Sequence, residues 1–302
     1  MLISQDLPIL LTLLSSAITA VLAGSLLLPR GQIMISEAAS HAVLPGLILG
    51  FALSGNHGWE VLIGAVGVIG LFVWGVGWLR TRHALGAGVE IAALFPVFFG
   101  IGILALSLTG LENTGTIDVD HILFGSLELL IWFEVAGWSD LLNPRVWLSA
   151  PSQMVTAVCS LLVSLSLCVL AYPWLHRTLL DQQFAGLQTP VAAGVARLIE
   201  VLVIALAAAA CLRSAGVVVA ITLFSAPVIA AWAVARRLWQ VWVFAGGFAL
   251  VAVLLTYGTS AAAILTLGVE PRLSGTLAIW LVILATAAAP VAQLLGRSRP
   301  LP

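Results

Sequence analysis

The sequence predicts an all-α fold: a polytopic helical membrane protein of about nine transmembrane helices, with short re-entrant or vestibule helices on the outer side. Of its 302 residues, 61% are hydrophobic and only 8% are charged, whereas a soluble domain usually has about 25% charged residues. Most of the apolar runs approach the ~20 residues that an α-helix needs to cross a bilayer. A membrane barrel would instead show short segments of alternating polarity, which this sequence lacks.

The apolar runs set the order of the predicted helices. We expect transmembrane helices at residues 7–28, 33–54, 59–79, 84–108, 152–175, 192–212, 216–235, 238–257 and 275–295. Residues 109–150 and 258–274 are too short or too broken to cross, so they are predicted to line an outer vestibule. The N-terminal segment MLISQDLPIL has no basic region, so we expect the first helix to be retained. Without an internal repeat or a soluble domain, residues 1–302 are predicted to form one transmembrane domain.

The arginines predict the orientation of the chain in the membrane, because short loops rich in arginine stay in the cytoplasm. One side of the predicted helices holds nine of the twelve: Arg30, Arg80, Arg82, Arg177, Arg197, Arg236, Arg237, Arg297 and Arg299. The other three, Arg145, Arg213 and Arg272, fall on the opposite side. This split places the N-terminus outside and the C-terminus in the cytoplasm.

Charge composition excludes two classes of function. The net charge is −1, which does not favour a nucleic-acid partner. The chain has no lysine, and a P-loop nucleotide site needs one to reach the phosphates. The polypeptide therefore has no ATPase site of that kind, and any ATP that drives it must be hydrolysed by another subunit.

An acidic residue and a histidine stand together in the second predicted helix, in the stretch SEAASHAVLPG at residues 36–46. Glu37 and His41 are four residues apart and share one helix face. If the helix runs through from Arg30, Glu37 lies about 10 Å and His41 about 16 Å from the cytoplasmic edge, near the middle of a core about 30 Å thick. The pair could be half of a four-ligand site for a divalent metal, a proton relay, or a structural hydrogen bond. Because ionisable groups are costly at this depth, a functional role is favoured.

Small residues surround this pair and predict close helix packing: Ala38, Ala39, Ser40, Ala42 and Gly46. Gly46 and Gly50 form a G-x-x-x-G pattern, which lets a partner helix approach closely. Pro45 lacks the N–H that would bond the carbonyl of His41, so it opens the helix beside the histidine.

The segment S-H-A-V-L-P-G, with an acidic residue at position 37 and Arg30 before it, resembles the signature of the zinc/manganese/iron ABC-transporter permeases. Members of that family usually have Gly-Asp where this chain has Ser36 and Glu37. Three further segments resemble the family in the same order: DVDHILFG at 118–125, QFAGLQTP at 183–190 and GVVVAITLFSAPVIAAWAVARRL at 216–238.

The resemblance implies the permease subunit of a bacterial importer that carries a divalent metal ion, with Zn²⁺ favoured over Mn²⁺ or Fe²⁺, from the periplasm to the cytoplasm. It implies a multi-pass protein of the cytoplasmic (inner) membrane that works as a homodimer, with ATP-binding-cassette ATPase subunits inside and a periplasmic metal-binding protein outside. The metal is then substrate, no cofactor is permanently bound, and the chain itself is not an enzyme. Phe184, Ala185 and Gly186 fall in the family's ATPase-docking segment. The alternative is an ion- or proton-coupled secondary transporter.

Four other acidic residues and a histidine invite weaker assignments. Asp118, Asp120 and His121 are candidates for the place where metal enters, and the aspartates could equally cap the helix that follows. Glu90 is expected to line the cytoplasmic exit or to reach the headgroups near Arg82. Glu200 is expected to pair with Arg197, three residues before it.

The arginine split predicts the outcome of a reporter-fusion experiment. A reporter fused after Arg82 or Arg237 should be cytoplasmic, and one inserted within residues 112–118 should be external. Paired reporters that are active on only one side of the membrane measure this directly. The reverse pattern would contradict the predicted orientation.

Overall fold

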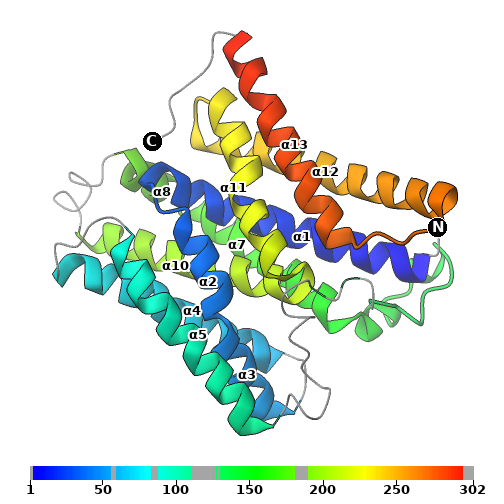
Figure 1. Ribbon diagram of the computed structural model, residues 1–302, viewed down its shortest axis with the longest axis horizontal. Helices are drawn as coiled ribbons and strands as arrows, with labels where there is room; N and C mark the ends of the chain where they lie inside the picture. The colour runs from blue at the N-terminus through cyan, green and yellow to red at the C-terminus, as the bar shows by residue number, and fades with distance from the viewer. Residues whose placement is uncertain are drawn as a thin grey trace.

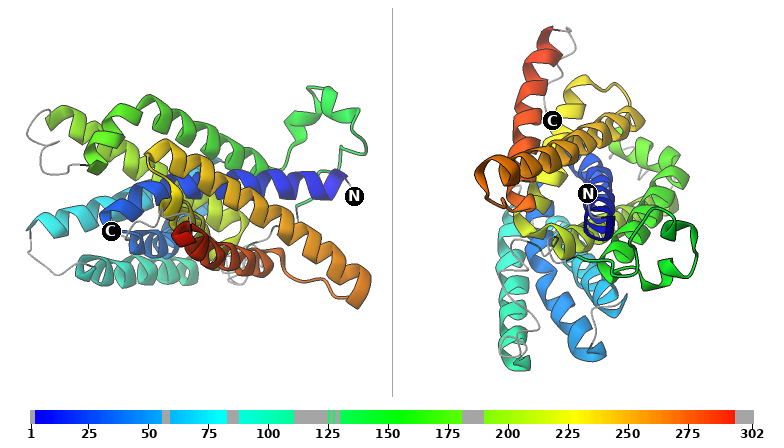
Figure 2. Two further views of the ribbon diagram at one scale, coloured as in Figure 1. Left: turned by 90° about the horizontal axis from the view of Figure 1, so that it is seen from above. Right: turned by 90° about the vertical axis from the view of Figure 1, so that its right-hand side faces the viewer.

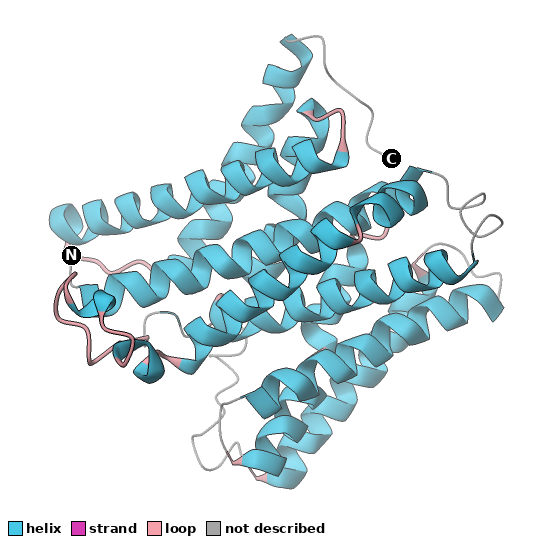
Figure 3. Ribbon diagram, turned by 180° about the vertical axis from the view of Figure 1, so that it is seen from behind, coloured by secondary structure: helices cyan, strands magenta, loops and turns pink. Residues whose placement is uncertain are grey.

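The computed structural model describes residues 3–55, 59–82, 88–110, 125, 127, 130–180 and 190–294. Within these residues the regular structure is helical (Figure 3). In chain order, as labelled in Figure 1 where there is room, the elements are α1 (Ile3–Leu27), η1 (Leu28–Arg30), α2 (Met34–Ala42), α3 (Leu44–Ser54), α4 (Trp59–Arg82), α5 (Val89–Thr109), η4 (Asp140–Leu142), η5 (Val146–Ser149), α7 (Ser152–Leu170), α8 (Tyr172–Leu180), α10 (Pro190–Ser214), α11 (Gly216–Val234), α12 (Leu238–Leu267) and α13 (Leu273–Leu294).

The predicted fold class is confirmed. Among the described residues, eight helical segments are long and apolar enough to cross a membrane, and α13 adds a shorter apolar stretch, Leu273–Ala288. Each of the nine predicted helices coincides with a helix, or with a pair of consecutive helices, in the structure. The chain is a multi-pass membrane protein.

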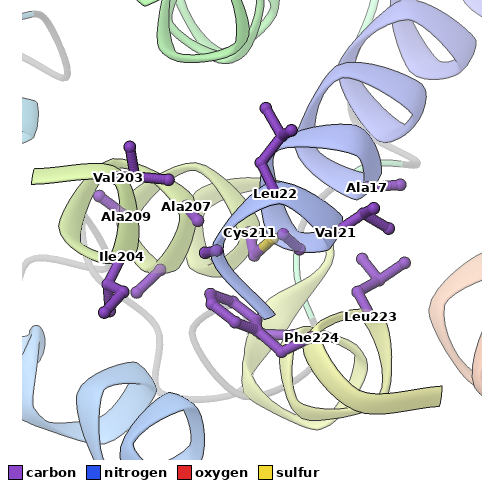
Figure 4. Packing of buried hydrophobic residues seen from close by; sticks show 14 of the residues in the cluster. Ala17, Val21, Leu22, Val203, Ile204, Ala207, Ala209, Cys211, Leu223 and Phe224 are labelled. Carbon is purple, nitrogen blue, oxygen red and sulfur yellow. The ribbon is translucent and has the colours of Figure 1, made fainter. Parts of the chain in front are cut away.

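Helix α1 lies at the centre of the bundle. Seen end-on (Figure 2, right), it runs between α12 and α13 on one side and α3, α4 and α5 on the other. It packs against α7, α10, α11 and α12, and Figure 4 shows its Ala17, Val21 and Leu22 among side chains of α10 and α11. The small side chains of Ala17 and Ala20 are fully buried, which lets neighbouring helices approach closely.

Several polar side chains in this core are hydrogen-bonded within the protein. The Ser214 hydroxyl of α10 donates to the Ser16 hydroxyl of α1 at 2.9 Å, and the Cys211 thiol contacts the Ser16 carbonyl at 3.4 Å. Thr12 and Thr19 donate to carbonyls four residues earlier in their own helix. Such bonds remove the cost of placing hydroxyl groups where no water is available.

The second membrane span is broken between α2 and α3. Gly31 ends η1 with a left-handed φ of 62°, and α2 begins only at Met34. The expectation of one helix running in from Arg30 is therefore wrong: Glu37 lies about 5 Å and His41 about 11 Å along α2. Val43 separates the two helices and accepts hydrogen bonds from the amides of Gly46 and Leu47 at 2.9 and 3.1 Å. The break falls where Pro45 has no N–H to give to the His41 carbonyl.

Helix α3 is held against α4 by backbone contact. A Cβ added at Gly46 would lie 2.4 Å from the Gly64 carbonyl oxygen, and one added at Gly50 would lie 2.6 Å from the Val61 Cα. These distances leave no room for a side chain, so only glycine permits this approach of α3 to α4.

A second correction concerns residues 258–274, which were expected to form a separate short segment that lines an outer vestibule. Helix α12 instead runs on through Leu267. Thr259 and Thr266 donate to the carbonyls of Leu255 and Ala262 in the preceding turn, both at 2.7 Å, so the polar residues of this stretch are compatible with a helix. Similarly, the helix expected at residues 152–175 ends at Leu170, and α8 follows after Ala171.

Two ion pairs join helices at the end of the bundle where the arginines gather. Glu200 of α10 pairs with Arg30 of η1, so the expected pairing with Arg197 is wrong. Glu90 of α5 accepts from the Arg80 Nε of α4 at 2.7 Å, which replaces the expected position near Arg82. Both carboxylates are almost completely buried.

The contact between α1 and α11 predicts a strong effect of one added methyl group. A Cβ at Gly24 would lie 2.0 Å from the Phe224 carbonyl oxygen, so Gly24→Ala should force the helices apart and destabilise the protein by about 1–3 kcal/mol. Equilibrium unfolding in detergent measures the loss. Gly67→Ala on α4, where no atom lies within 4 Å, is the matched control and should not destabilise the protein, because alanine favours a helix more than glycine does. Equal stability of the two variants would contradict the close α1–α11 contact.

Candidate metal site

Glu37 and His41 lie on one short helix, α2, at opposite ends of it. The Glu37 residue is exposed on the surface of this single chain, and His41 is half-buried. The carboxylate acts on the imidazole electrostatically, but among the described residues no hydrogen bond joins the two side chains. The alternative of a structural Glu–His hydrogen bond thus has no counterpart in the described structure.

Two phenylalanines of α5 hold the His41 ring. Its centroid lies 5.3 Å from that of Phe95 and 5.7 Å from that of Phe99, with interplanar angles of 62° and 87°. The two phenyl rings stack on each other at 6.0 Å. Edge-to-face contacts of this kind are favourable and orient the rings. Neither phenylalanine was predicted as a site residue, although their i, i+4 spacing in FPVFF places them on one face.

The small residues of α2 pack inside the chain. Ala38, Ala39 and Ala42 are buried in a helix that packs on α4, α5, α10 and α11. Ser36 and Ser40 donate to carbonyls of their own helix at 2.5 and 2.8 Å. The helices that lie against these small residues belong to the same chain. Glu37 remains as the polar side chain of α2 that faces outward.

The described residues of one chain supply too few ligands for a closed metal site. Within the described part of the chain, no group of three or more His, Cys, Asp or Glu side chains is close enough to hold an ion. Cys168 of α7 and Cys211 of α10 are buried, and Cys159 of α7 is half-buried. A site built on Glu37 and His41 therefore needs ligands from outside the described residues or from a second chain.

Six of the sequence-predicted site residues lie outside the described residues: Asp118, Asp120, His121, Phe184, Ala185 and Gly186. Gly125, the last residue of the DVDHILFG segment, is described. It has a φ of 80°, and a Cβ there would lie 2.3 Å from the Ser214 carbonyl oxygen. The end of that segment thus sits directly against the junction of α10 and α11.

Residues 130–150 form a compact turn structure near the N-terminal end of α1. The Trp132 amide donates to the Ser4 carbonyl at 2.8 Å, and its indole packs edge-on against Trp147. Asp140 accepts from the amides of Ala136 and Gly137, both at 2.9 Å, and these bonds lower the pKa of the Asp140 carboxyl.

Comparison with known proteins agrees with this architecture. Residues 7–135 match the model of the ABC 3 transport family. An uncharacterized membrane protein of Cyanophora paradoxa is 35% identical over 114 residues, which are 38% of this chain and 36% of that protein. The manganese transport system membrane protein MntC of Listeria monocytogenes is 29% identical over 118 residues, 39% of each chain. The match thus spans well under half the length of these curated relatives.

The fold itself is similar over nearly the whole chain. The solved structure of PsaBC from Streptococcus pneumoniae in complex with Fab aligns with a TM-score of 0.72, covering 96% of this chain and 94% of that one, at 19% identity. The resemblance to the divalent-metal ABC-transporter permeases is confirmed. It includes the α2 helix with Glu37 and His41, which lies inside the matched residues.

Proposed function

We propose that this chain is the permease subunit of an ATP-binding-cassette importer that moves a divalent transition-metal ion into the bacterial cytoplasm across the inner membrane. One observation carries the proposal: a membrane helix within the matched region presents an outward-facing carboxylate beside a half-buried imidazole. Both groups are ligands for divalent metals.

The exposure of Glu37 favours a homodimer. A charged side chain of a membrane helix is costly where it meets lipid, so it is usually covered by protein or lines a water-filled path. A second copy related by a two-fold axis would cover the charge and bring a second Glu37 and His41 to the same place. Two imidazoles and two carboxylates then complete a four-ligand set.

This donor set favours Zn²⁺, which takes four nitrogen and oxygen ligands. The relative from Listeria monocytogenes is named for manganese, and carboxylates with added water also suit Mn²⁺. We therefore propose that the transported ion is Zn²⁺, Mn²⁺ or Fe²⁺, and the uptake of these three ions is to be compared. Because protons compete for both ligands, metal binding weakens as the pH falls.

The partners follow from what the chain lacks. No lysine is present for a P-loop, so we propose that separate ATPase subunits hydrolyse ATP and dock on the segment containing Phe184, Ala185 and Gly186. A metal-binding protein delivers the ion outside, near Asp118, Asp120 and His121. Residues 1–302 form the one transmembrane domain of this subunit.

The proposal predicts the effect of three substitutions on metal uptake. His41→Ala and Glu37→Ala should abolish uptake because each removes two of the four ligands. Glu37→Asp should retain uptake, with a changed preference among Zn²⁺, Mn²⁺ and Fe²⁺, because it keeps the carboxylate but moves it by one methylene. Uptake into vesicles that contain the assembled transporter, normalised to the amount of complex, measures these effects.

The matched control is His176→Ala, which removes an imidazole from α8 at a distance from the site along the chain and should leave uptake unchanged. Near-normal uptake by His41→Ala would place the metal path elsewhere. Uptake that proceeds without an ATPase subunit or ATP would favour the secondary-transporter alternative.

A further inference from the structure

A cavity of about 290 Å³ lies at the arginine-rich end of the bundle, and neither Glu37 nor His41 is among its lining residues. Its walls come from α1 with η1, α2, α4, α8 and α10. Three guanidinium groups, those of Arg30, Arg80 and Arg197, meet there with the carboxylate of Glu200. The cavity is unsuited to the proposed passage of a metal cation, because its excess of positive charge repels the ion.

The described residues leave positive charge in this cavity without a partner. Glu200 pairs with Arg30 and Glu90 pairs with Arg80. Arg197 acts on Glu200 electrostatically but makes no hydrogen bond or ion pair with a residue in the described part of the chain. The Arg30 Nε is buried and likewise has no hydrogen-bond partner there. Buried polar groups are nearly always hydrogen-bonded, so this one points to a missing acceptor.

The guanidinium of Arg197, an exposed residue, lies against Gly77 of α4. A Cβ added at Gly77 would lie 2.1 Å from an Arg197 Nη atom, so the absence of a side chain at residue 77 is what lets the guanidinium lie against α4. Arg197 and Arg80 both line the cavity. A planar guanidinium with fixed donors matches the oxygens of a phosphate group.

The rest of the wall is apolar and indicates an amphipathic occupant. Leu27, Ile35, Val73, Val76, Val201 and Ile204 complete the lining. Basic pockets between membrane helices on the cytoplasmic side bind phosphate headgroups of anionic lipids. By the arginine split, this end of the bundle is cytoplasmic.

We propose that this cavity binds the phosphate group of an anionic phospholipid from the cytoplasmic leaflet. Arg197 and the Nε of Arg30 donate to the phosphate oxygens, and an acyl chain lies along the apolar wall. Bound in this way, the lipid links α4 to α10 and stabilises the end of the bundle. The proposal rests on the orientation of the chain and not on the identity of the transported ion.

The test measures phospholipid retained by the purified full-length protein. Protein is extracted from vesicles of phosphatidylcholine with phosphatidylglycerol, and the bound lipid is identified by mass spectrometry of the intact protein. We expect phosphatidylglycerol to be enriched on the wild type. Arg197→Gln should weaken its binding by about tenfold, the effect of losing one charge-assisted hydrogen bond, and Arg197→Lys should retain part of it. Arg177→Gln, which removes an exposed arginine of α8 outside the cavity, should bind like the wild type.

A second arm separates lipid from free phosphate by measuring the thermal stability of the same proteins with inorganic phosphate. If phosphate stabilises the wild type but not Arg197→Gln, and no lipid is retained, the site binds phosphate but the lipid source is overturned. If Arg197→Gln and Arg177→Gln retain equal amounts of phosphatidylglycerol, the proposed site is overturned altogether.

Discussion

The cost of leaving a charged group unpaired in hydrocarbon governs how this bundle is built. An unpaired charge at the centre of a membrane helix costs at least about 2.5–3.5 kcal/mol, so each acidic residue within a helix must find a partner or a function. Glu90 and Glu200 form ion pairs with Arg80 and Arg30, which belong to other elements. These two pairs tie α4 to α5 and η1 to α10. Removing Arg30 or Arg80 would leave its glutamate partner charged and buried, which is more costly than losing both members of the pair.

Glu37 does not follow this pattern, and the surrounding structure explains why it is available. Ser36 and Ser40 are bonded to their own helix, the alanines of α2 are buried, and α3 is fixed on α4 through Gly46 and Gly50. The helix break at Val43 follows directly after His41. The carboxylate and the imidazole therefore stand on a short, well-supported helix beside the aromatic wall of α5, with the carboxylate directed away from the chain.

The sequence predicted those features that depend on local composition. Long apolar runs gave the helices and their order, and the motif around His41 gave the candidate site. Prediction from the sequence failed where contacts between residues far apart in the sequence decide the structure. Glu200 was expected to pair with Arg197 because helical spacing identifies only partners that are close in the sequence. The tertiary fold instead brings Arg30 to Glu200. Phe95 and Phe99 went unnoticed for the same reason, since only the packing of α2 on α5 places them at His41. The left-handed Gly31 ended the helix that had been expected to run in from Arg30, and this moved Glu37 and His41 closer to the start of their helix.

In the proposed homodimer, two copies of the chain share one metal ion through Glu37 and His41. Electron paramagnetic resonance of Mn²⁺ bound to the purified full-length protein, combined with the metal content per chain, tests this shared site most directly. We expect one ion for every two chains, with magnetic coupling to imidazole nitrogen that disappears in His41→Ala. One ion per chain, or nitrogen coupling that persists without His41, would contradict it.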